Sequence, residues 1–163
     1  MSISSYSELQ VALTNWLNDS NLTDRIPEFI SLAEIRIARE LAKRKINDVV
    51  TTADLTIDAQ SIALPTDFLG FKRIYLDTSP KTVLNLVSED QLFNSVADST
   101  TGKPIMYAIE GSNLVVAPTP DTSYTAKIAY YQKPAALSDV NTTNAILTNA
   151  HDVYLYGSLI ESE

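Results

Sequence analysis

The sequence predicts an α+β protein with an N-terminal helical hairpin, antiparallel strands and hairpins with one short inserted helix, and a C-terminal helix. Apolar residues recur at helical spacing in about 4–46 and 148–163, and at every second position through much of about 48–134. Because elements of one type come in runs, this order favours α+β over a doubly wound parallel sheet. The length of 163 residues predicts one domain, with these segments as its helical and β-rich parts.

The first helix is expected to begin after Ser5. Ser5 and Glu8 have the spacing of a capping box, in which the hydroxyl accepts from a free helical N–H and the carboxylate reaches back. Apolar residues then recur at intervals of three and four up to Leu17. This pattern predicts one amphipathic helix that ends near Asn18.

The second helix is expected over about 24–45, with Thr23 or Asp24 as its cap and Pro27 in its first turn, where a missing N–H is harmless. One face carries a continuous apolar stripe, formed by Leu22, Ile26, Phe29, Ile30, Ala33, Ile37 and Leu41. Two further strips remain, an apolar one of Ile35, Ala42 and Ile46 and a basic one of Arg25, Arg36, Arg39 and Lys43. A single monomer core does not need these strips, so their seven residues are the candidate subunit interface.

The basic strip has three interpretations. It could be a solvated helix face with pairs such as Glu40 and Arg44 four residues apart, a contact to an acidic neighbouring subunit, or a contact to DNA phosphates. The net charge of −8 places DNA last, because phosphate contacts need clustered lysine and arginine. The solvated face is favoured, and the subunit contact comes second.

Strands are expected after Asn47, where apolar and polar residues alternate. The expected strands cover 49–57, 61–64, 68–77, 105–109, 114–116 and 124–131, with a hairpin turn at 111–113. Capping-box spacing at Ser88 and Gln91 predicts the inserted helix, which extends to about Asp98. The segment 135–144 is expected to be a loop, and the last helix to begin near Thr148 or Asn149.

No catalytic residue, metal site or cofactor is expected, and the protein is predicted not to be an enzyme. The chain has no cysteine, and its one histidine, His151, stands beside Asp152 at a helix start, where local capping or solvation is the usual role. Asp54 and Asp58 share a strand face but lack the dense run and central glycine of a calcium loop. Residues 102–104 lack the glycines and hydroxyl of a P-loop.

Neither a membrane segment nor a signal peptide is expected. No window approaches about 18 consecutive apolar residues. Residues 1–8 lack a basic region followed by an apolar run.

Five segments in order resemble the head-to-tail adaptor (connector) proteins of tailed bacteriophages. Residues 64–76, LPTDFLGFKRIYL, resemble the family's LPxDFLxxKRVYL stretch, and 102–111, GKPIMYAIEG, its GxPxxYAIEG hairpin. Residues 114–121 and 130–139 match the next strand and loop, and 152–161, DVYLYGSLIE, resemble the DLYLYGALxEA helix. The opening helices are similar as well. Members of the family usually continue the last helix well beyond the position of Glu163.

The resemblance implies a structural virion protein in the neck between head and tail, made in the host cytoplasm. It implies a homo-oligomeric ring, commonly twelvefold, with the portal protein on one side and tail or nozzle proteins on the other. Double-stranded DNA would pass through the lumen without sequence-specific binding. The alternatives are another virion part, such as a tail-completion or gatekeeper protein, and a small α+β enzyme. A closed ring favours the adaptor, and a monomer favours the enzyme.

A ring requires head-to-tail contacts that close by rotation. The apolar and basic strips of the second helix are the expected source of one side of that contact. An acidic subunit repeated around a pore also predicts a negative lumen, if its acids face inward, and like charge would keep passing DNA from adhering.

Overall fold

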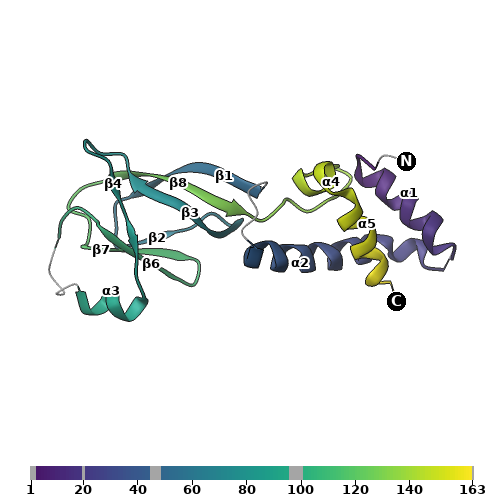
Figure 1. Ribbon diagram of the computed structural model, residues 1–163, viewed down its shortest axis with the longest axis horizontal. Helices are drawn as coiled ribbons and strands as arrows, with labels where there is room; N and C mark the ends of the chain where they lie inside the picture. The colour runs from purple at the N-terminus through teal and green to yellow at the C-terminus, as the bar shows by residue number, and fades with distance from the viewer. Residues whose placement is uncertain (1–2, 20, 45–48, 96–100, 163) are drawn as a thin grey trace. The chain divides into compact units, whose positions relative to one another are not determined.

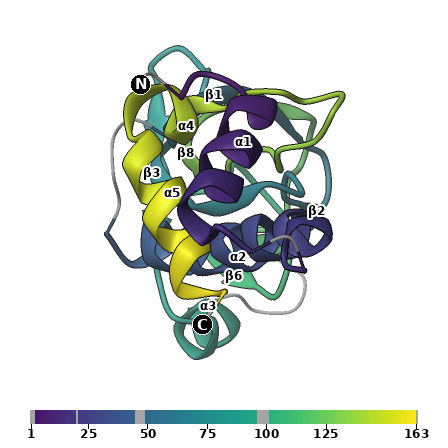
Figure 2. The ribbon, with the colours of Figure 1, turned by 90° about the vertical axis from the view of Figure 1, so that its right-hand side faces the viewer.

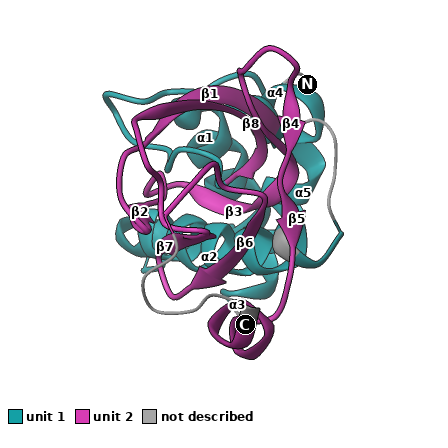
Figure 3. Ribbon diagram, turned by 90° about the vertical axis from the view of Figure 1, so that its left-hand side faces the viewer, with its two compact units in different colours: residues 1–49, 133–163 teal, residues 50–132 magenta. Residues whose placement is uncertain are grey.

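The computed structural model describes residues 3–19, 21–44, 49–95 and 101–162 (Figure 1). It confirms the α+β class, since helices form both ends of the chain and two four-stranded sheets lie between them in sequence. The chain divides into a helical unit of Met1–Val49 and Lys133–Glu163, and a β-rich unit, 50–132, inserted between these segments (Figure 3). The single cooperative domain stays a prediction.

The helical unit contains four α-helices and one short 3₁₀ turn among its described residues. They are α1 (Tyr6–Leu17), the 3₁₀ turn η1 (Thr23–Arg25), α2 (Ile26–Arg44), α4 (Ala145–Asn149) and α5 (His151–Ile160). Helix α5 packs against both α1 and α2, and Figure 2 shows it running beside α1. The predicted apolar stripe of α2 is confirmed: Ile26, Phe29, Ile30, Ala33 and Leu41 are buried, and Leu22 and Ile37 are partly buried.

The boundaries of α1 follow the sequence pattern closely. The Ser5 hydroxyl accepts from the Glu8 amide at 3.3 Å, as a capping residue should. The Glu8 carboxylate, however, accepts from the backbone N–H and hydroxyl of Ser4, both at 2.7 Å, so the return bond goes one residue further than expected. Asn18 ends the helix with a φ of 48°, a left-handed conformation that asparagine tolerates.

The expected cap of the second helix was wrong. The chain enters α2 through η1, which has no side-chain cap. The Thr23 hydroxyl instead donates to the Asp19 carbonyl at 3.4 Å and closes the preceding turn. Pro27 occupies the second position of α2, where its missing N–H leaves no helical hydrogen bond unmade.

The C-terminal helix begins earlier than the sequence pattern predicted. Asn144 caps α4 by accepting from the Leu147 amide at 2.9 Å, so the helical turn starts at Ala145. Ala150 then interrupts the helix with a φ of −148°, and α5 follows. Asparagine before an apolar run was a readable cap signal; the break at Ala150 had none.

The first sheet of the β-rich unit is entirely antiparallel. Its strand order is β1 (Val50–Ile57), β8 (Tyr124–Gln132), β3 (Phe68–Leu76) and β4 (Thr82–Val83). Strands β1 and β8, through which the chain enters and leaves the unit, are direct neighbours, with Val50 opposite Tyr131. Both faces of β8 are covered in its second half, since Ile128 and Tyr130 on one face and Ala129 and Tyr131 on the other are buried.

The second sheet contains the expected hairpin and one unexpected parallel pair. Its order is β2 (Ser61–Ala63), β7 (Asn113–Ala117), β6 (Met106–Glu110) and β5 (Asn85–Leu86). Strands β6 and β7 form the hairpin, and Gly111 takes a φ of 60° in its turn. Strand β5 pairs with β6 in parallel, and β1 and β2 lie in different sheets although only residues 58–60 separate them.

Candidate docking surfaces

Helix α2 presents a continuous exposed face that contains three of the seven predicted interface residues. Leu32, Ile35, Arg39 and Lys43 follow one another at intervals of three and four and are all exposed, Ile35 by 50%. We call these four residues the α2 exposed face. Sequence reasoning missed Leu32, although its spacing from Ile35 would have revealed it.

The other predicted interface residues have different positions. Arg25 belongs to η1 and is exposed. Arg36 borders the α2 exposed face and is exposed as well. The side chain of Ala42 and the whole of Ile46 lie outside the described residues, so their assignment stays a prediction.

Ion pairs occupy much of the basic strip. Arg25 pairs with Glu28 at 3.2 Å. Lys43 and Arg44 pair with Glu40 at 3.0 and 3.7 Å, and together with Arg36 they hold the pKa of Glu40 below its usual range. These groups are largely exposed, and such pairs contribute little to stability, so they are easily exchanged for other partners. Arg39 forms no ion pair within the described part of the chain.

An apolar groove of about 410 Å³ lies between α2, α4 and α5. We call it the α2–α5 groove. Its apolar lining comprises Ala33, Ile37, Leu41, Ala145, Ile146, Ala150, Val153, Gly157 and Ile160, and its polar lining comprises Arg36, Glu40, Arg44 and Asn149. Arg36 also pairs with Glu161 at 3.0 Å. Val153 and Ile160 are exposed, so apolar surface continues from the groove onto α5.

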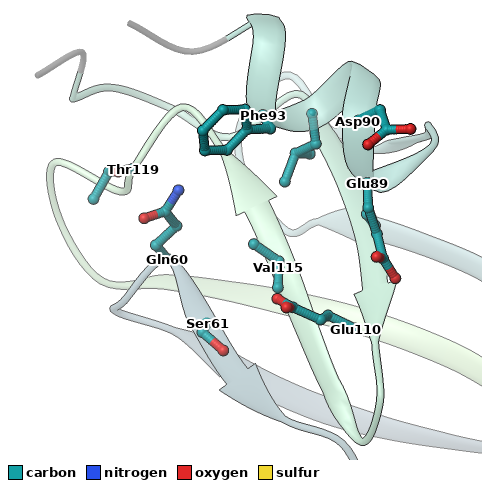
Figure 4. Close-up of a pocket in the computed structure, with 10 residues that line it drawn as sticks. Gln60, Ser61, Glu89, Asp90, Phe93, Glu110, Val115 and Thr119 are labelled. Carbon is teal, nitrogen blue, oxygen red and sulfur yellow. The ribbon is translucent and has the colours of Figure 1, made fainter. Parts of the chain in front are cut away.

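An acidic pocket of about 540 Å³ lies in the β-rich unit between α3 (Glu89–Ser95) and the second sheet (Figure 4). Glu89 and Asp90 from α3 and Glu110 from β6 line it, and none of its described lining residues is basic. Phe93 lies on the α3 side of the pocket with 80% of its surface exposed. The adjacent Leu92 is buried against Ala108 and Ala117, which turns Phe93 outward.

A partly buried polar network around Tyr154 fixes the shape of the helical unit. The Tyr154 hydroxyl accepts from the Asn144 side-chain amide at 2.7 Å and donates to the Glu34 carboxylate at 3.3 Å. The same carboxylate oxygen accepts from the Leu137 amide at 2.7 Å, and the Asn144 amide also donates to the Ala135 carbonyl at 2.8 Å. The loop before α4 is thereby tied to both α2 and α5, the two long walls of the α2–α5 groove.

Glu34 makes the stability of this network depend on pH. Burial raises the pKa of the Glu34 carboxyl above its ordinary value of 4.5, against the opposing hydrogen bonds from Leu137 and Tyr154. The carboxyl therefore contributes most below pH 4.5, and this contribution is lost as the pH rises through the raised pKa. Relative to Glu34→Gln, the wild-type protein is expected to gain stability when the pH falls from 7 to 4.5.

Urea unfolding of both proteins at several pH values measures this effect. Glu28→Gln removes one charge from an exposed position of the same helix and serves as the control. A constant stability difference between wild type and Glu34→Gln across this pH range would contradict the assignment.

Asn144→Ala is expected to lower the free energy of unfolding by about 1–2 kcal/mol, because it removes the cap of α4 and the bonds to Tyr154 and Ala135. Urea unfolding followed by circular dichroism measures the loss. Asn15→Ala, at an exposed position within α1, is the control and is expected to cause no loss. Equal stabilities of the two variants would show that the Asn144 bonds do not matter.

The polar residues considered for chemistry are dispersed. His151 is the first residue of α5 and is partly exposed, with the exposed Asp152 beside it. Asp54 forms a cross-strand ion pair with Lys127. Among the described residues, no three or more His, Asp or Glu side chains gather in a way that could hold a metal ion. In the same residues, no helix combines the length and apolar character needed to cross a bilayer.

Comparison with protein families finds a match over almost the whole chain. The family model described as SU10 adaptor protein matches residues 4–162, which include nearly all of both units and all of the surfaces described above. No curated protein matches the chain.

Proposed function

Because the chain belongs to the SU10 adaptor protein family of phage adaptor proteins, we propose that it is a structural head-to-tail adaptor. In this proposal, copies of the chain form a closed ring beneath the portal, in the neck of the virion. The ring binds the portal protein on one side and tail proteins on the other. The chain acts by binding and not by catalysis.

The α2 exposed face supports self-association most directly. Leu32 and Ile35 expose apolar surface beside Arg39 and Lys43, although the core stripe on the other side of α2 already packs within the helical unit. Mixed apolar and basic surface of this kind is suited to a protein contact, in which the aliphatic parts are buried and the charges remain at the rim. In the ring, this face meets the neighbouring copy.

The channel of the ring is proposed to carry double-stranded DNA without reading its sequence. The helical and β-rich units each have a net charge of −4, so the overall charge of −8 is shared evenly between them. An acidic excess along the lumen would repel the phosphate backbone and let DNA slide. A reconstruction of the assembled neck tests this, and a lumen with no excess of Asp and Glu would contradict it.

Ile35→Asp is expected to abolish assembly, because a charged carboxylate would replace an apolar contact at each subunit boundary and would have to be desolvated there. Native mass spectrometry and light scattering measure the mass of the purified chain, alone and mixed with portal protein. Val11→Asp places the same charge at an exposed apolar position on another helix of the same unit and is expected to assemble normally. Circular dichroism checks that both variants are folded.

Two results would count against the proposal. A wild-type chain that stays monomeric both alone and on the portal would contradict the ring itself. A ring that forms equally well with Ile35→Asp would leave the adaptor role standing but exclude the α2 exposed face as its interface.

A further inference from the structure

The α2–α5 groove has an unusual local charge for this protein. Between Arg36 and Arg44, α2 carries four basic residues and one acidic residue, whereas the whole chain has a net charge of −8. Two of these basic residues, Arg36 and Arg44, line the groove themselves. An occupant of the groove should therefore combine an apolar side chain with acidic neighbours.

Helix α3 of the β-rich unit has this chemistry. Phe93 is 80% exposed, the most exposed aromatic side chain among the described residues. It follows Glu89 and Asp90 within the same two turns, and these acids and Phe93 line the same pocket (Figure 4). Because the buried Leu92 packs α3 against the sheet, the backbone that carries Phe93 is already held in place with the ring directed outward.

We infer that Phe93 of one copy inserts into the α2–α5 groove of the next copy, with Glu89 and Asp90 facing the groove's Arg36 and Arg44. The inference rests on the proposed ring and adds, beside the α2 exposed face, a second pair of surfaces that meet between neighbouring copies. The surfaces differ from each other and lie on the same chain, so their contact is head-to-tail, the type that generates rings. An isologous pairing of two grooves would bring their basic rims together.

The energetics of the contact follow from its composition. A phenyl ring that leaves water for an apolar groove is the usual anchor of a protein interface, and the charges around it act mainly in steering and in choosing the register. Arg44 pairs with the exposed Glu40, and Arg36 with the partly buried Glu161, both within the helical unit. The exposed Arg44–Glu40 pair is weak, so an acid of the neighbour can replace it at little cost. Arg36 is itself exposed and can accept a second carboxylate beside Glu161.

Cysteine cross-linking tests the contact directly, because the chain contains no cysteine of its own. Phe93→Cys and Val153→Cys are made as separate proteins, mixed under assembly conditions, with portal protein present and absent, and oxidised. A disulfide-linked dimer containing one of each protein is expected, since the two thiols would lie at the same contact. One chain carrying both substitutions should give a ladder of multimers.

A matched control uses Val83→Cys in place of Phe93→Cys. Val83 is also an exposed apolar residue of the β-rich unit, but it lies on β4 in the other sheet. Mixed with Val153→Cys, it should give no heterodimer. If Val83→Cys and Phe93→Cys cross-linked equally well to Val153→Cys, the disulfides would come from random collisions, and the inference would be overturned.

The strength of association in variants without added cysteines provides an independent test of the contact. Phe93→Ala is expected to weaken association about 30-fold, as the loss of a buried aromatic anchor does. Asp90→Lys is expected to weaken it about tenfold, and adding Arg44→Glu to the same chain should restore most of the loss. Sedimentation velocity over a range of concentrations measures all three.

The outcomes separate this inference from the proposed function. Rings that form with wild-type mass but neither cross-link through positions 93 and 153 nor respond to Phe93→Ala would overturn the inference and leave the ring intact. Absence of self-association, alone and on the portal, would overturn both. Val153→Asp rings that assemble normally but lose portal or tail protein would assign the groove to that partner and also overturn the inference.

Discussion

Tyr154→Ala is expected to lower the free energy of unfolding of the helical unit by about 3–5 kcal/mol, the loss typical of a buried aromatic residue. Tyr154 is 1% exposed, and its hydroxyl joins Asn144 to Glu34. The substitution therefore opens a cavity between α5 and α2 and removes the shared partner of both polar groups. Urea unfolding followed by circular dichroism measures the loss.

Two comparisons separate the contribution of the aromatic side chain of Tyr154 from that of its hydroxyl. Tyr154→Phe keeps the ring and is expected to cost about 1–3 kcal/mol through the lost hydrogen bonds. Tyr156→Ala, two residues away on the exposed side of α5, loses an edge contact with Trp16 and is expected to cost about 1 kcal/mol. If Tyr154→Ala lowered the free energy of unfolding no more than Tyr156→Ala, the polar network would not determine the stability of the helical unit.

Leu114→Ala is expected to lower the free energy of unfolding of the β-rich unit by about 2–5 kcal/mol. Leu114 is 0% exposed and lies on β7, between Ile62 of β2 and Ile109 of β6. The backbone there is held by hydrogen-bonded strands on both sides, so the cavity cannot easily collapse. Leu86→Ala makes the same change on edge strand β5 at a position 66% exposed and is expected to cost at most about 0.5 kcal/mol.

The two large substitutions together test whether the chain is one cooperative domain. A single transition, shifted by both Tyr154→Ala and Leu114→Ala, would support the single-domain prediction. Two transitions, each moved by only one substitution, would show that the helical and β-rich units unfold independently.

Local sequence signals predicted most of the elements. Ser5 and Asn18 bound α1 as expected, the α2 stripe is buried, and Gly111 turns the β6–β7 hairpin. The resemblance to phage head-to-tail adaptors is confirmed by the family match over residues 4–162. These features depend on neighbours in sequence or on short motifs, which one sequence displays directly.

The pairing of distant elements could not be predicted in the same way. Strands β1 and β8 are neighbours although Asp54 and its partner Lys127 lie 73 residues apart in the sequence. The parallel pairing of β5 with β6 could not be predicted either, because strands this short show no sequence pattern that indicates their partner. The bond between Glu34 and Tyr154 spans 120 residues. A glutamate on a helix is usually solvated, so the sequence alone predicts an exposed Glu34. It is half-buried in the structure because Leu137 of the loop before α4 and Tyr154 of α5 pack over it.

The candidate site was predicted in part. Ile35, Arg36, Arg39 and Lys43 are exposed on α2 as the surplus strips required, and their role at a subunit boundary stays a prediction. The α2–α5 groove was missed because its walls come from both ends of the chain. Phe93 was missed because seven residues of α3 are too few for a helical pattern to separate its buried side from its exposed side.

The adjacency of β1 and β8 gives the protein a natural graft point. Val50 and Tyr131 face each other across one ladder, so their Cα atoms lie about 5 Å apart. A tight two- to five-residue turn can span that gap. Replacing the 50–132 segment with such a turn should therefore leave the backbone of the helical unit continuous, so that this unit can be produced and studied without the β-rich unit.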